Sequence, residues 1–178
     1  VATMKPLMKQ IKARGIQVIA NAGGVNPSAC RDALVAAAQA EGVDLKIAAV
    51  LGDDLMPQVE AMRAAGTTEM FSGAAFPAKV MSANAYLGAF PIAAALAAGA
   101  DIVVTGRCVD SAVTLAPLIA RFNLTAADLD KLAQGSLVGF LMMRRPPTST
   151  LESTLLPCAT LCRSACPIAA ALPAGGSF

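Results

Sequence analysis

The sequence contains no histidine, no tryptophan and a single tyrosine. Without histidine, Ser/His/Asp and Cys/His catalysis, imidazole metal ligands and histidine proton shuttles are excluded within this chain. The five cysteines are an odd number. They follow no recognisable secretory signal, so we expect reduced thiols and a cytoplasmic location. Any chemistry in this chain must therefore use groups other than histidine.

Clustered positive charge and long hydrophobic runs are also missing. The net charge is only +2, and the basic residues are scattered, which excludes the basic stripe of a nucleic-acid-binding protein. Hydrophobic residues make up 56% of the chain. The longest run of low polarity, 85–100, is nevertheless interrupted by Gly88, Pro91 and Gly99 and is shorter than a membrane span. We therefore expect neither a nucleic-acid nor a membrane partner.

Apolar runs and helical periodicities alternate along most of the chain. The expected strands lack polar alternation, as buried parallel strands do, and lie at 16–20, 45–51, 68–72 (the weakest) and 101–105. Helices are expected at 4–14, 27–41, 55–65 and 111–121, with Thr125 capping a further helix. The alternation predicts an α/β fold: a three-layer, mostly parallel, Rossmann-like sheet with helices on both faces.

The character of the sequence changes near residue 140. Five of the eleven prolines follow residue 143, and no strand or helix rhythm continues there. We predict an α/β domain over 1–139 and an irregular tail over 140–178. Cys158, Cys162 and Cys166 would line one face of a helix and suggest a metal or iron–sulfur site, but the surrounding prolines argue against that helix.

Ligands of open α/β sheets bind beyond the carboxyl ends of the strands, and the loops expected there are polar. In the first loop, Asn21, Gly23, Gly24 and Asn26 precede Pro27, which begins a helix. The glycines allow close backbone approach, and the helix N–H groups favour a phosphate or carboxylate. A tight turn in which Asn26 caps the helix explains the same residues equally well.

The second loop contains Asp53 and Asp54. Asp54 directly precedes a helix start and is expected to cap it. Asp53 lacks such an explanation, which makes it a candidate for ligand binding or for general-base catalysis. A magnesium site is the less favoured alternative, and we predict no metal.

The third loop contains Gly106, Arg107, Asp110 and Ser111. The guanidinium of Arg107 fits a carboxylate or phosphate, although a local ion pair with Asp110 is the simpler alternative. Asp110 or Ser111 is expected to cap the next helix, and Asp110 is a second candidate general base. Cys108 is either a buried thiol or, less favoured, a nucleophile.

A fourth polar segment contains Ser82, Asn84, Tyr86 and Gly88. Its hydroxyl, amide and phenol groups precede an alanine-rich helix. They suit either ligand contact or helix packing, and the sequence does not separate the two.

Five segments in order carry a family resemblance: NAGGVNPSAC, GDDL, SANAYLGAFPIAAAL, TGRCVDSAVTLAPLI and AQGSLVG. Together they resemble the amino-terminal domain of the acyclic terpene utilisation family over most of 1–139. The resemblance implies bacterial catabolism of branched acyclic terpenoids such as citronellol and geraniol, at the acid or acyl-CoA level. Members of that family are longer at both ends, so we expect a fragment with a fold incomplete at both ends and a tail that comes from a shifted reading frame.

These observations lead to one functional prediction and one alternative. A carboxylated or CoA-linked branched substrate would bind at Asn21, Gly23, Gly24, Asn26, Asn84, Gly106, Arg107 and Ser111, with Asp53 or Asp110 as the base. Alternatively, the chain is a noncatalytic binding or assembly domain that partners an acyl-CoA enzyme. The sequence indicates no particular cofactor and leaves a homo-oligomer open.

Overall fold

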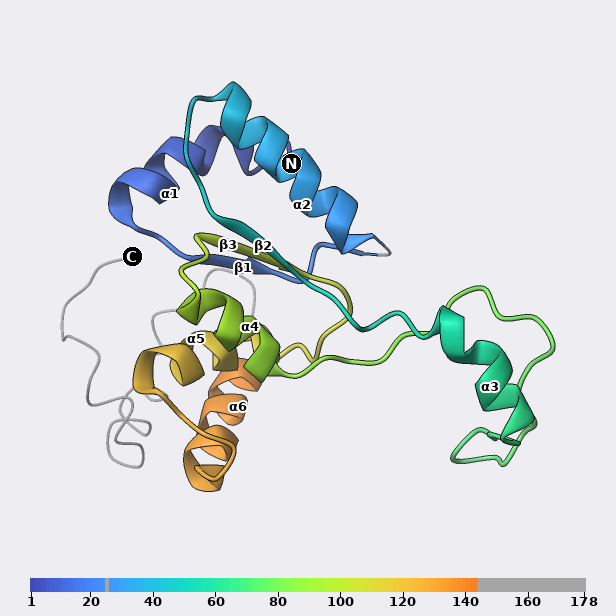
Figure 1. Ribbon diagram of the computed structural model, residues 1–178. Coiled ribbons are helices and arrows are strands. Elements are labelled where there is room, and N and C mark those ends of the chain that lie inside the picture. The colour runs from blue at the N-terminus through green and yellow to red at the C-terminus, as the bar shows by residue number, and fades with distance from the viewer. Residues whose placement is uncertain (25, 144–178) are drawn as a thin grey trace, which may run out of the picture. The chain divides into compact units, whose positions relative to one another are not determined.

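The computed structural model describes residues 1–24 and 26–143 (Figure 1). The chain forms two compact units, Val1–Val109 and Asp110–Phe178. The expected irregular tail beyond residue 143 lies outside the described residues, and so do Cys158, Cys162 and Cys166.

The first unit is built on a three-stranded parallel sheet. Its strands are β1 (Val18–Ala20), β2 (Ile47–Val50) and β3 (Ile102–Thr105), in the order β1-β3-β2. The central strand β3 pairs with both neighbours, so that Ile102 lies opposite Val18 on one side and Ile47 on the other. All four residues of β3 are buried, which agrees with a strand that has no polar alternation. The predicted parallel α/β fold is confirmed.

Helices cover both faces of this sheet. The 3-10 turn η1 (Lys5–Leu7), α1 (Met8–Arg14) and α2 (Pro27–Ala40) lie on one face, and α4 (Ala89–Ala97) lies on the other (Figure 1). The core on the first face consists of seven buried side chains: Met8, Ile11, Leu34, Ala38, Leu45, Ile102 and Val104. On the other face, α4 contacts β2 and β3 and buries Ile92, Ala93 and Leu96.

The end of α1 and the start of α2 lie where local chemistry predicts, whereas the helix expected from residue 4 is a 3-10 turn as far as Leu7. Gly15 ends α1 in the left-handed conformation with φ of 61°, which glycine adopts without strain. At the start of α2, the side chain of Asn26 accepts a hydrogen bond of 2.9 Å from the backbone N–H of Ala29. The predicted cap is therefore confirmed, and Pro27 takes the first helical position, where no N–H partner is needed.

The segment between β2 and α4 departs from the prediction. The helix expected at 55–65 is a 3-10 turn, η2 (Met56–Gln58), followed by α3 (Val59–Ala64). The strand expected at 68–72 is wrong: Thr68 makes only an isolated antiparallel bridge with Ala75, and residues 70–72 form the turn between them. The carboxylate of Glu69 accepts hydrogen bonds from the N–H groups of Phe71 and Ser72 and from the Ser72 hydroxyl, which lowers the Glu69 pKa and favours a turn over a strand.

In the second unit, α5 (Ala112–Phe122) packs against α6 (Leu129–Met143). Gly135 and Gly139 lie at this contact. A Cβ on Gly135 would lie 2.7 Å from Leu115 Cδ1, and one on Gly139 would lie 2.9 Å from the Ser111 carbonyl oxygen. Small residues four positions apart therefore let the two helices approach closely.

Thr125 precedes α6 as expected and forms a reciprocal pair with Asp128. The carboxylate of Asp128 accepts hydrogen bonds from the Thr125 N–H at 2.9 Å and from the hydroxyl at 2.8 Å. The Thr125 hydroxyl in turn accepts a bond from the Ala127 N–H at 3.3 Å. The bonds from Thr125 lower the pKa of Asp128 to about 2. The predicted cap at Thr125 is wrong for α6, because α6 begins only at Leu129 and the Thr125 hydroxyl accepts from Ala127, in the turn that precedes the helix. None of the helices among the described residues has both the length and the apolarity to cross a membrane.

Candidate ligand-binding site

The loops that follow the three strands meet at one edge of the sheet. After β1, the N–H of Gly23 donates a hydrogen bond of 3.0 Å to the carbonyl of Thr105, the last residue of β3. After β3, the N–H of Gly106 donates a bond of 3.3 Å to the carbonyl of Val50, the last residue of β2. Backbone hydrogen bonds therefore hold together the loops in which the sequence places its polar residues.

Asp53 lies at the centre of these contacts and is only 4% exposed. Its Oδ2 accepts a hydrogen bond of 2.8 Å from the Arg107 N–H and one of 3.1 Å from Asn84 Nδ2. The Asp53 carbonyl accepts a further bond of 2.7 Å from the Ala85 N–H. One buried carboxylate thus joins the loop after β2 to the loop after β3 and to the segment before α4.

Two of the predicted glycines are required by close contacts. A Cβ on Gly106 would overlap the carboxylate of Asp53, so no larger residue fits there without moving that side chain. A Cβ on Gly23 would lie 2.6 Å from Pro27 Cβ. At Gly24 no close contact requires glycine. This residue is exposed, and its φ of 57° lies in the left-handed region that glycine adopts without strain.

The segment before α4 continues the sheet beyond β3 through one parallel bridge between Leu87 and Cys108. Leu87 N–H donates to the Arg107 carbonyl at 3.0 Å, and Val109 N–H donates to the Leu87 carbonyl at 2.9 Å. Cys108 is only 2% exposed, and its Sγ lies 3.4 Å from the Thr105 hydroxyl oxygen. The interpretation of Cys108 as a buried thiol is confirmed. The sequence analysis missed this bridge, although the alternation of residues 84–88 was a usable signal.

The remaining predicted residues of the first unit lie at the surface. Asn21, Asn26, Asn84 and Arg107 are all exposed. The Arg107 guanidinium makes no hydrogen bond or ion pair within the described part of the Val1–Val109 unit. Its backbone is fixed by Asp53, whereas its side chain is exposed.

Asp110 and Ser111 belong to the second unit. The prediction that one of them caps α5 is wrong for Ser111, whose side chain makes no capping hydrogen bond. Ser111 has helical dihedral angles, φ of −63° and ψ of −18°, instead of the extended backbone that a capping residue adopts. An Arg107–Asp110 ion pair would span the two units and stays a prediction.

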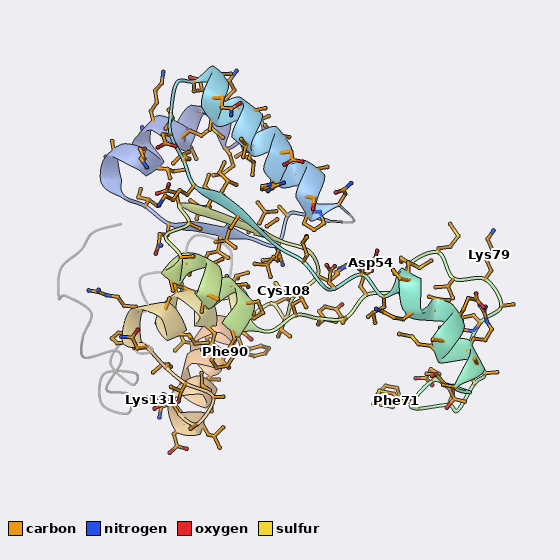
Figure 2. All side chains as sticks on the ribbon, viewed as in Figure 1. Asp54, Phe71, Lys79, Phe90, Cys108 and Lys131 are labelled. Carbon is orange, nitrogen blue, oxygen red and sulfur yellow. The ribbon has the colours of Figure 1, made fainter. Side chains whose placement is uncertain are left out.

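Asp54 begins a lobe that leaves the sheet and returns to it at Asn84. Its carboxylate accepts a hydrogen bond of 2.9 Å from the N–H of Met56, the first residue of η2, although the N-cap position itself is taken by Leu55. An antiparallel bridge pairs Asp54 with Asn84. Figure 2 labels Asp54 at the start of this lobe, with Phe71 and Lys79 further along it. The lobe is thus attached to the sheet next to Asp53.

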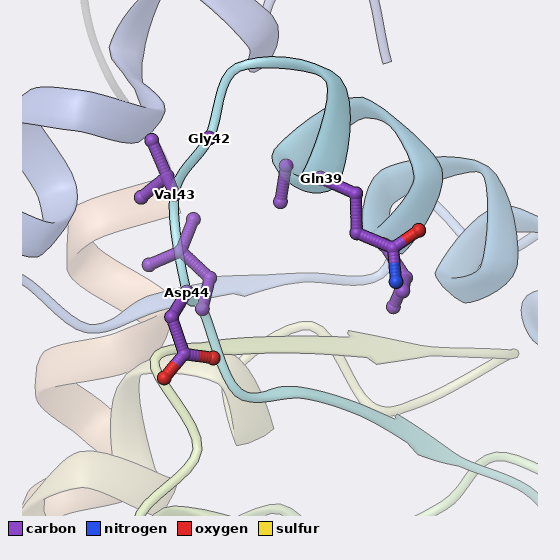
Figure 3. Close-up of a pocket in the computed structure, with 7 residues that line it drawn as sticks. Gln39, Gly42, Val43 and Asp44 are labelled. Atoms are coloured by element: carbon purple, nitrogen blue, oxygen red, sulfur yellow. The ribbon is translucent and has the colours of Figure 1, made fainter.

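An open depression of about 460 Å³ lies elsewhere in the first unit (Figure 3). It is lined by the end of α2 and the turn that leads to β2: Val35, Ala38, Gln39, Gly42, Val43, Asp44 and Leu45. These residues precede β2, so the depression lies away from the carboxyl ends of the strands. Contiguous residues of a helix-to-strand turn account for it, and we assign it no function. Among the described residues, no group of three or more acidic or cysteine side chains is arranged to hold a metal ion.

The geometry at the carboxyl edge combines an exposed cation with a rigid buried support. Asp53, Gly106 and Asn84 fix the backbone at Arg107, and Gly23 and the start of α2 lie beside the end of β3. Such an edge can bind an anion through the guanidinium and through backbone N–H groups.

Comparison with known proteins identifies the family. The model of the acyclic terpene utilisation family protein AtuA matches residues 1–143. Neither the curated proteins nor the solved structures gave a match. Since the matched region covers the whole described sheet and both helices of the second unit, the chain belongs to the acyclic terpene utilisation family AtuA.

Proposed function

We propose that the protein binds a carboxylated or CoA-linked branched acyclic terpenoid at the loops that follow its parallel strands. Family membership assigns the protein to acyclic terpene utilisation. The observation that carries the finer proposal is the environment of Arg107, whose backbone is anchored by Asp53 while its side chain is exposed and unpaired within the described first unit. A fixed backbone with a free guanidinium suits recognition of a carboxylate or phosphate.

The neighbouring loop supplies further groups for an anion. Gly23 is held at the end of β3, and the N–H groups in the first turn of α2 follow Asn26 and Pro27. Partial positive charge at a helix amino terminus favours anions. In this proposal Arg107 provides the main charge, and the exposed amides of Asn21 and Asn84 contact polar groups of the ligand.

Asp53 is the proposed general base if the protein is an enzyme, with Asp110 as the second candidate. Both oxygens of a carboxylate accept protons, and Asp53 Oδ1 makes no hydrogen bond among the described residues. A noncatalytic binding or assembly domain that partners an acyl-CoA enzyme is the alternative. The alternative is favoured because Asp53 Oδ2 accepts two hydrogen bonds that hold the loops together, which is a structural role.

Calorimetric titration of the full 178-residue chain tests the binding proposal. The ligands are a citronellate-type acid and its CoA thioester. Loss of charge-assisted hydrogen bonds in Arg107→Ala is expected to weaken binding at least about tenfold. Arg14→Ala is the matched control, because Arg14 is an exposed arginine in the last turn of α1. Equal affinities for the wild type and Arg107→Ala would contradict the proposal.

The same ligands separate the enzyme from the binding domain. Turnover of either compound that disappears in Asp53→Asn or in an Asp110→Asn variant supports catalysis. Binding with no chemical change of the ligand, in the presence of the wild-type protein, supports the alternative. These two variants retain the side-chain shape, so folding is expected to be preserved.

A further inference from the structure

The bridge between Leu87 and Cys108 creates two faces with opposite character. Side chains alternate along extended backbone, so the residues that flank the bridge, Arg107 and Val109, are expected on the side opposite Cys108. Exposure follows this alternation: Cys108 is 2% exposed, whereas Val109 is 45% exposed and Arg107 is also exposed. On the partner segment, Tyr86 neighbours Leu87 and is 66% exposed.

We call Tyr86, Gly88, Arg107 and Val109 the ladder face. In the parallel register, Tyr86 lies beside Arg107, and Gly88 lies beside Val109, with backbones about 5 Å apart. A Cβ on Gly88 would meet nothing within 4 Å, so the space above this position is open. One cation, one aromatic ring and one branched aliphatic side chain, all of exposed residues, thus neighbour an open position at Gly88 on a backbone fixed by hydrogen bonds.

We infer that the ladder face binds the free carboxylic acid of a branched acyclic terpenoid, with its carboxylate on Arg107 and its hydrocarbon chain across Tyr86 and Val109. This inference rests on the proposed function and narrows it from two forms of the substrate to one. Charge complementarity selects the occupant. In this register Arg107 neighbours the exposed residues Tyr86 and Val109, so the ligand needs its negative charge directly attached to its hydrocarbon part.

A CoA thioester does not meet this requirement as well as the acid does. Its acyl carbonyl is uncharged, and its phosphates are separated from the hydrocarbon chain by the long pantetheine arm. The corresponding terpenoid alcohol has the chain without the charge, and acetate has the charge without the chain. These three compounds therefore test the two halves of the ladder face separately.

Tyr86 provides a direct spectroscopic signal. It is the only tyrosine, and the chain has no tryptophan, so emission excited near the tyrosine band reports on this side chain alone. A citronellate-type acid does not absorb there. We expect saturation with the acid to change the Tyr86 emission, whereas acetate at the same concentration leaves it unchanged.

Calorimetry on two variants tests the role of the ring. Tyr86→Ala is expected to weaken acid binding about threefold to tenfold, because apolar contact with the ring is lost. Tyr86→Phe keeps the ring and is expected to retain affinity. Filling the open position in Gly88→Leu is expected to weaken binding similarly. Since Tyr86 is 66% exposed and a Cβ on Gly88 would meet nothing within 4 Å, circular dichroism should show an unchanged fold.

The outcomes distinguish this inference from the function on which it rests. Acid affinity that falls in Arg107→Ala but is unchanged in Tyr86→Ala overturns the ladder face and leaves the anion site intact. A CoA thioester that binds as tightly as the acid also overturns it. Unchanged affinity in both variants contradicts the inference and the proposed function together. Weaker binding in both variants, with a changed Tyr86 emission, supports both.

Discussion

Replacing Asp53 should destabilise the first unit more than replacing any exposed acidic residue. The side chain is 4% exposed and accepts hydrogen bonds of 2.8 Å from the Arg107 N–H and 3.1 Å from Asn84 Nδ2. Hydrogen bonds to a charged group typically contribute about 1.5–3 kcal/mol each. The Asn84 side chain is exposed and can bond to water instead, so the Arg107 N–H dominates the loss. We expect Asp53→Ala to lower the free energy of unfolding by about 2–4 kcal/mol.

Asp53→Asn separates hydrogen bonding from charge. An amide oxygen in the position of Oδ2 can accept both hydrogen bonds, whereas the amide NH₂ would take the position of Oδ1 beside Gly106. We therefore expect a smaller destabilisation than in Asp53→Ala, about 1 kcal/mol, from the loss of the charged acceptor. Asp44→Ala is the control, because Asp44 is an exposed acidic residue of the same unit.

Urea denaturation followed by circular dichroism measures these differences, with the three variants and the wild type at equal concentration. The expected order of stability is wild type and Asp44→Ala, then Asp53→Asn, then Asp53→Ala. A value for Asp53→Ala within about 0.5 kcal/mol of the wild type would refute the reasoning, since surface substitutions have effects of that size. It would mean that the three loops hold their positions without the carboxylate.

Four further substitutions test other contacts. Gly106→Ala should destabilise the protein by about 1–3 kcal/mol through overlap with Asp53, whereas Gly88→Ala, with open space around it, should not; equal stabilities by urea denaturation would contradict this. Gly139→Ala should likewise destabilise the α5–α6 pair, and an unchanged thermal midpoint would argue against close helix contact. Because the pKa of Asp128 is lowered from 3.8 to about 2, its contribution to stability is present above pH 4 and is lost as the pH falls towards 2. Asp128→Asn should remove this part of the pH dependence of helicity, and an identical acid titration by circular dichroism would count against it.

The strands and most helix ends could be predicted because their signals are local. The apolar run that contains β3 needs burial on both faces, and Asn26 and Gly15 carry the chemistry of a helix start and a helix end. The strand predicted at 68–72 does not form, because the Glu69 side chain accepts hydrogen bonds from backbone N–H groups that a strand would use. Hydrophobic periodicity does not reveal a side-chain acceptor of this kind.

At the candidate site, the parallel topology was enough to predict that the loops lie at one edge of the sheet. It was not enough to predict the structural role of each side chain. The sequence singled out Asp53 because nothing local explained it. The structure provides the explanation through Asn84 and Arg107, which lie far away along the chain. For Ser111, by contrast, the sequence predicted a capping role that the structure does not show. Serine favours helix starts, but Ser111 has helical dihedral angles and lies against Gly139 of α6. Contacts between distant segments decide both cases.

The strand order β1-β3-β2 has a consequence for biosynthesis. β1 and β2 form no ladder with each other, and each takes its described partner from β3, the last of the three strands to be synthesised. Until residues 102–105 have emerged from the ribosome, β1 and β2 lack the strand with which both of them pair among the described residues. Nascent chains stalled before this point should be cleaved readily by protease, and chains stalled after β3 has cleared the exit tunnel should resist. Folding of this unit is therefore delayed by its topology, since long-range pairings form slowly even when their sequences favour strands.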